Sequence, residues 1–132
     1  MRVKLINVRN GKEIETVAIV NTGYESLESE ITLPKKAAEV LGLYPLPADT
    51  QLVSYQTMGG EIRMVRIPKI IKVKLENVEA LAFATISEVE REVVINDMLS
   101  GELGIIIENA GKGLWRIRGE ARVRKSENPE YW

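Results

Sequence analysis

The sequence contains no cysteine and no histidine among its 132 residues. Disulfide scaffolds, thiol nucleophiles and thiolate zinc sites are therefore excluded, as are the Ser-His and Cys-His pairs that activate a nucleophile. Most transition-metal sites also lose their usual imidazole ligand. We expect no metal and no cofactor, so any catalysis must depend on carboxylates, Lys, Tyr, Ser or Thr.

Neither sign of charge dominates, because 18 Lys and Arg residues nearly balance 19 Asp and Glu residues. A net charge of −1 gives the whole chain no attraction to nucleic acid or to an acidic membrane. No apolar run approaches the roughly 20 residues of a membrane-spanning helix, and the N-terminal segment lacks the apolar middle of a signal peptide. We therefore expect a cytoplasmic protein with no membrane partner and no nucleic-acid partner.

A basic cluster near the C-terminus is a local exception to this balance. It consists of Arg116, Arg118, Arg122, Arg124 and Lys125. Glu120 and Glu127 interrupt the cluster, and it lacks an aromatic stacking platform apart from Trp115. A solvated face is therefore the better interpretation of this cluster.

What the chain does have is the composition of one globular domain, with 45% hydrophobic and 28% charged residues. Many Lys and Glu residues, two glutamines and the missing cysteines fit a protein from a hot environment. We place the domain at residues 1–118. Residues 119–132 form a charged C-terminal tail that we expect to be partly disordered.

Alternation of apolar residues with a period of two predicts mostly β-strands. The expected strands cover residues 2–7, 14–20, 31–33, 51–56, 62–75, 80–86, 93–95, 105–107 and 114–117. Asn10-Gly11 is typical of a type I′ hairpin turn, which needs a positive φ at both central residues. Pro68 indicates a sheet edge or a β-bulge within its long strand.

Two short helices are expected between the strands. Residues 35–41 have helical composition, and Gly42 follows them as a C′ residue. Residues 97–103 form the second helix, with Asn96 or Asp97 as its N-cap. The sequence therefore predicts an all-β domain with one or two short helices.

Residues 17–24, VAIVNTGY, carry the strongest functional signal. An apolar strand, whose end we expect to be buried on both faces, leads into a polar tripeptide with glycine at a sharp turn. Taken alone, these residues describe only a strand end and a turn.

This segment resembles the signature of the retroviral-type (retropepsin-like) aspartic proteases, in which an apolar strand precedes Asp-Thr/Ser-Gly and an apolar residue. Asn21 stands where the family carries its catalytic Asp. Further similarities follow in the family's order over roughly residues 1–118: ITLPKKAAEVLGL, a glycine-containing hairpin at the position of the flap, VVINDML and GIII. The resemblance is to the bacterial and archaeal single-domain branch. It implies a closed acid-protease β-barrel that forms half of a two-fold homodimer.

The resemblance also implies roles for individual residues. Asn21, Thr22 and Gly23 would form the catalytic loop, with the Thr22 hydroxyl bonded to the opposite chain. An extended peptide or unfolded protein would contact Tyr24, Met58, Gly59 and Gly60. The chain departs from the family at Ile95-Asn96, where Gly-Arg is common, so the resemblance does not supply an Arg-mediated brace of the loop.

An amide at position 21 removes the family's chemistry. In the family, two Asp carboxylates share one proton and activate a water molecule, whereas an amide is neutral and has no basic site. Losing the general base alone costs about 10²–10⁴-fold in rate. The chain as written is therefore predicted to be proteolytically inactive. It is either a natural pseudo-protease or the Asp→Asn form of an active enzyme. Outside the family, the alternative is a non-enzymatic β-barrel that serves assembly or binding.

Overall fold

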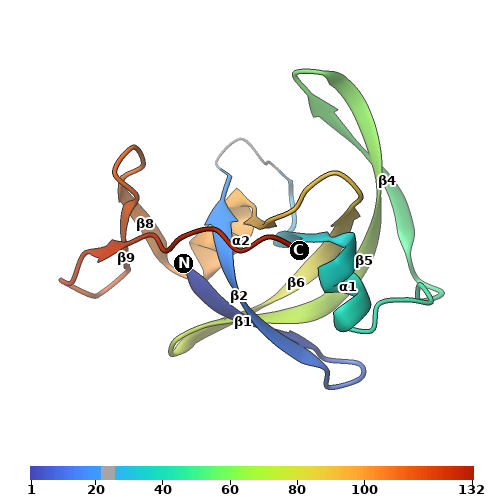
Figure 1. Cartoon of the computed structure of the whole chain (residues 1–132), viewed down its shortest axis with the longest axis horizontal. Helices are drawn as coiled ribbons and strands as arrows, with labels where there is room; N and C mark the ends of the chain where they lie inside the picture. The colour runs from blue at the N-terminus through green and yellow to red at the C-terminus, as the bar shows by residue number, and fades with distance from the viewer. Residues whose placement is uncertain (22–25) are drawn as a thin grey trace.

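The computed structural model describes residues 1–21 and 26–132 of the chain (Figure 1). Within these ranges the backbone forms ten strands and two helices. The strands are β1 (Arg2–Asn7), β2 (Glu13–Val20), β3 (Glu30–Pro34), β4 (Gln51–Thr57), β5 (Gly60–Leu75), β6 (Val78–Ser87), β7 (Val93–Ile95), β8 (Ile105–Asn109), β9 (Leu114–Ile117) and β10 (Arg124–Lys125). The helices are α1 (Lys35–Val40) and α2 (Asp97–Glu102). The prediction of a mostly β chain with two short helices is confirmed.

Six strands of the described chain close into a barrel in the order β1-β2-β7-β3-β6-β5, because β5 also pairs with β1. The β2–β7 and β3–β6 pairs are parallel, and the other pairs of the ring are antiparallel. β4 pairs with β5 and forms with it a hairpin that projects from the barrel in Figure 1. The expected closed β-barrel is therefore confirmed.

The barrel core is built mainly from branched aliphatic side chains. Alternation along each strand turns every second side chain inward, as at Val3 and Leu5 of β1. The largest fully buried side chains are Leu5, Ile31, Leu33, Leu41, Leu43, Ile67, Ile70, Ile71, Leu75, Ile95, Leu99 and Leu103. Burying one such side chain contributes about 1.5–3 kcal/mol, so the stability of the barrel comes chiefly from this interior.

The β1–β2 hairpin is confirmed, but the prediction of a type I′ turn is wrong. Gly11 has a φ of 79°, whereas Asn10 is not among the described non-glycine residues with positive φ. The Asn10 side chain accepts a hydrogen bond from the backbone N of Lys12 (2.8 Å) and donates one to the carbonyl of Leu41 (3.1 Å). These side-chain bonds hold the turn in a different conformation.

The end of β2 is less buried than expected. Val17 and Ala18 are buried, but Ile19 is 38% exposed and Val20 is only half-buried. Alternation turns Ile19 to the face opposite Ala18, and that outer face of the strand is open. The expectation of burial on both faces is therefore wrong for this strand end.

Strands β8, β9 and β10 form a separate three-stranded sheet in the described chain, and residues beyond it run along the barrel. The backbone N of Trp132 donates to the carbonyl of Arg91 (2.9 Å), and its indole N–H donates to the Thr16 hydroxyl (3.1 Å). The division of the chain at residue 118 stays a prediction. Neither helix in the described residues, at six residues each, is long and apolar enough to cross a membrane.

Candidate functional site

Two asparagines follow neighbouring parallel strands. β2 ends at Val20 and β7 ends at Ile95, and these two residues lie opposite each other in register. Asn21 and Asn96 therefore leave the barrel at the same edge of the sheet. The backbone N of Asn21 donates to the Ile95 carbonyl (3.1 Å). Asn21 is exposed in the single chain, whereas Asn96 is completely buried.

Asn96 connects helix α2 to the segment that leads into β3. Its Oδ1 accepts from the backbone N of Leu99 (3.0 Å), which caps α2 as the sequence predicts. The same oxygen accepts from the backbone N of Glu30 (3.0 Å), and Nδ2 donates to the Glu28 carbonyl (2.9 Å). This amide therefore braces the segment that leads into β3.

The other predicted site residues fall into two groups. The first group lies outside the described residues, so the roles implied for it stay predictions: Thr22, Gly23 and Tyr24. The second group lies at the tip of the β4–β5 hairpin: Met58, Gly59 and Gly60. Met58 is fully exposed, and Gly60 has a φ of 109° with open space around its α-carbon.

A buried carboxylate, which the sequence analysis missed, joins this hairpin to the Asn21 edge of the barrel. The side chain of Glu30 is 0% exposed. The Tyr55 hydroxyl of β4 donates to its Oε1 (2.5 Å), and the Arg66 guanidinium of β5 donates to its Oε2 (3.1 Å). The Ser26 hydroxyl also donates to Oε2. One carboxylate thus bonds to both strands of the hairpin and to the segment that precedes β3.

Arg66 is oriented by further contacts. Its Nε and NH2 groups donate to the Gln51 side-chain oxygen (3.1 and 3.0 Å). Its guanidinium carbon lies 4.9 Å from the centre of the Phe83 ring. The Arg66 side chain is only 21% exposed. These contacts hold its guanidinium in position to pair with Glu30.

The hairpin face that carries Tyr55 and Arg66 is otherwise largely apolar. Cross-strand register places three more side chains on this face: Val53, Ile62 and Met64. Val53 and Met64 are half-buried, and Ile62 is 43% exposed. This face therefore offers apolar side chains beyond the bonds to Glu30.

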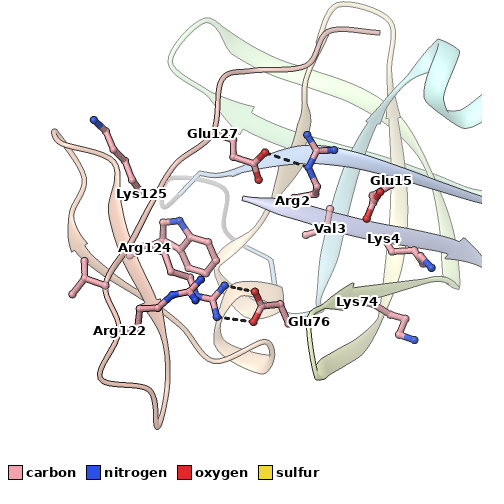
Figure 2. Close-up of a pocket in the computed structure, with 12 residues that line it drawn as sticks. Arg2, Val3, Lys4, Glu15, Lys74, Glu76, Arg122, Arg124, Lys125 and Glu127 are labelled. Atoms are coloured by element: carbon pink, nitrogen blue, oxygen red, sulfur yellow. Dashed lines mark hydrogen bonds and ion pairs between the residues drawn. The ribbon is translucent and has the colours of Figure 1, made fainter.

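A pocket of about 690 Å³ lies away from Asn21, between β1 and the C-terminal segment (Figure 2). Ion pairs join its two sides, from Arg2 to Glu127 (3.2 Å) and from Arg124 to Glu76. The Arg124 guanidinium beside Glu76 holds the pKa of that carboxyl below its ordinary value. Six basic side chains and three acidic side chains line this pocket, so the two ion pairs neutralise only part of its positive charge.

Within residues 1–21 and 26–132, no three acidic side chains lie together as ligands for a metal ion. Neither a scan against protein-family models nor a search of curated proteins returns a match to this chain.

Proposed function

We propose that this chain is a retropepsin-like protein in which Asn21 replaces the catalytic Asp. Two copies form a two-fold dimer with the Asn21 loops at the axis. An extended peptide or unfolded segment binds between these loops and the β4–β5 hairpins, and it is not cleaved. The chain is thus a peptide-binding pseudo-protease, or an active endopeptidase whose Asp has been replaced.

The observation that carries this proposal is the parallel β2–β7 pair. Asn21 follows one of these strands and Asn96 follows the other, and α2 begins immediately afterwards. The apolar strand that ends before Asn21 and the second strand with its helix therefore meet at one edge of a closed barrel. This is the order in which the sequence resembles the family.

Exposed apolar side chains beside Asn21 support the dimer. Ile19 of β2 is 38% exposed and Met98 of α2 is 45% exposed, and Leu27 in the segment held by Asn96 is almost fully exposed. A second copy would cover these side chains, because obligate dimer interfaces are apolar and usually bury more than about 2,000 Å². A single Asn21 loop supplies only half of a two-fold site.

The chemistry of position 21 separates binding from cleavage. A side-chain carboxamide has an acceptor oxygen and a donor nitrogen, so it can form hydrogen bonds with a peptide carbonyl or a water molecule. It cannot take a proton from that water, because it carries no basic site at ordinary pH. The Asn21 pair should therefore bind peptide over a broad pH range and leave the peptide bond intact.

Restoring the carboxylate tests the proposal. We expect Asn21→Asp to cleave a quenched fluorescent peptide library at acidic pH, with a gain of at least about 10²–10⁴-fold over the unmodified chain. Cleavage should need one shared proton per dimer, so the rate should fall on both sides of its optimum. The matched control is Asn109→Asp, which makes the same change in the exposed residue that ends β8.

Calorimetry with a statine-type peptide provides the binding measurement. The Asn21 form should bind it equally over the acidic range, and the Asp form should bind it most tightly when the dyad holds a single proton. If the folded Asp variant cleaves nothing and both forms bind the peptide alike, position 21 does not face a ligand. The alternative of a non-enzymatic assembly module would then replace the proposal.

A further inference from the structure

We propose that Glu30 is a positioning residue whose carboxylate fixes the β4–β5 hairpin relative to the Asn21 edge of the barrel. It thereby controls how readily a peptide enters between the hairpin and the loop. The control of peptide entry rests on the proposed function. The positioning itself can be measured without any peptide.

The hairpin projects beyond the sheet that supports it. Pairing of β5 with β6 begins at Val65, opposite Ile86, so residues 60–64 of β5 pair with β4 in the described sheet and not with the barrel. Arg66 stands next to this boundary. Backbone pairing therefore connects the outer part of the hairpin to the barrel only at the base of the hairpin. The hairpin can bend most easily at this base.

Tyr55 provides a bond on the far side of that boundary. It lies opposite Ile62, within the projecting part of the hairpin, and its hydroxyl reaches Glu30 at 2.5 Å. Arg66 bonds to the same carboxylate from the base of the hairpin. Glu30 thus holds the hairpin at two points on either side of the boundary, and two such bonds restrict rotation more than one.

The other end of this connection is the Asn21 edge. Glu30 precedes Ile31, which pairs with Ile95 of β7, and Ile95 accepts the hydrogen bond from Asn21. The separation is two strand spacings, about 10 Å. Asn96 also holds the backbone of Glu30 in place. Strand pairing and hydrogen bonds therefore connect Asn21 to the carboxylate that holds the hairpin.

Stability alone does not account for a charge at this position. Burying a carboxylate costs several kcal/mol, and a buried ion pair is often no more stabilising than apolar side chains of the same volume. Tyr55 and Arg66 belong to the β4–β5 hairpin, whereas Glu30 belongs to β3, which pairs with neither strand of that hairpin in the described sheet. The carboxylate fixes the hairpin relative to β3 through directional hydrogen bonds, which an apolar side chain could not form.

Hydrogen exchange of the peptide-free protein tests the positioning. Tyr55→Phe removes only one hydroxyl, and a hydrogen bond to a charged group is worth about a 10- to 100-fold change in an equilibrium. We expect amides of residues 53–64 to exchange roughly tenfold faster or more, while amides of β1 and β6 stay unchanged. The control is Tyr131→Phe, which removes a hydroxyl from an exposed tyrosine. Equal hairpin exchange in the two variants would overturn the proposal.

A paired substitution separates positioning from stability. Arg66→Met leaves the Glu30 carboxylate without its cation and should lower the melting temperature. Glu30→Leu combined with Arg66→Met should recover most of that loss, yet hairpin exchange should stay fast. Recovery of slow hairpin exchange in the double variant would contradict a positioning role.

The peptide measurement keeps this inference distinct from the proposed function. With a statine-type peptide, Tyr55→Phe should speed both association and dissociation, since a looser hairpin opens more often. Unchanged rate constants would overturn control of peptide entry. Absence of any peptide binding by the unmodified dimer would remove the proposed function, while the exchange experiment would still decide whether Glu30 positions the hairpin.

Discussion

At the scale of single residues, Asn96 shows how one buried amide joins a helix to a loop. Replacing it with Ala removes the α2 cap and leaves the backbone N of Glu30 and the carbonyl of Glu28 without this partner. We expect Asn96→Ala to lower the free energy of unfolding by about 2–4 kcal/mol in urea titrations. Asn109→Ala, at an exposed turn where the side chain accepts from Lys112, should cost far less. If both variants lost the same free energy of unfolding, Asn96 would not brace the segment that contains Glu28 and Glu30.

For Asn96, the sequence predicts the helix cap but not the hydrogen bonds to distant residues. The cap of α2 depends on neighbours three residues away, so a local pattern reveals it. The bonds from Asn96 to Glu28 and Glu30 join positions more than 60 residues apart, and no local pattern encodes them. Glu30 was missed for the same reason, because its partners Tyr55 and Arg66 lie 25 and 36 residues further along the chain.

At the scale of elements, the Glu76–Arg124 pair joins the β5–β6 turn to β10. The lowered pKa of Glu76 stabilises the fold above the unfolded-state pKa, and this contribution is lost as the pH falls through the folded-state pKa. We expect Glu76→Gln to melt slightly below the unmodified chain at pH 7, and the difference should be smaller at pH 3. The difference should be small and should shrink in high salt, because the Glu76 side chain is 47% exposed, although that of Arg124 is only 11% exposed.

Glu79→Gln is the control for this measurement, since Glu79 forms a longer ion pair with Lys72 (3.9 Å). Its melting curve should stay close to that of the unmodified chain at both pH values. A Glu76→Gln difference that persists unchanged at pH 3 would show that the titration of Glu76 is not its cause.

Elements themselves were predictable where the pattern is local. Alternation at Val3, Leu5 and Asn7 gave β1, and the bulge expected at Pro68 is present as a register shift between Ile67 and Ile71. The partner of a strand was not predictable in this way. Nothing in residues 51–57 indicates that β4 lies outside the closed ring, because that depends on which strand closes against β1.

At the scale of the whole molecule, a closed barrel leaves one edge with the exposed Asn21 and the apolar side chains beside it. The account predicts that this edge meets its copy in a two-fold dimer. Sedimentation at micromolar concentration should therefore give a dimer, and the charge substitution Met98→Glu on α2 should shift it toward monomer. If the unmodified chain and the Met98→Glu variant were both monomeric, the proposed site would be ruled out, since one Asn21 loop makes only half of it.

Cross-linking at position 21 tests the central claim most directly. The chain has no cysteine, so a single introduced thiol can pair only with the same residue of another copy. A disulfide needs β-carbons about 3.5–4.5 Å apart, which the loops meet only at or near the axis. The control is Lys12→Cys, at an exposed position immediately before the first residue of β2. We predict rapid, reducible dimer formation for Asn21→Cys at low micromolar concentration under mild oxidant, with little for Lys12→Cys. Equally slow cross-linking of both variants would contradict the account.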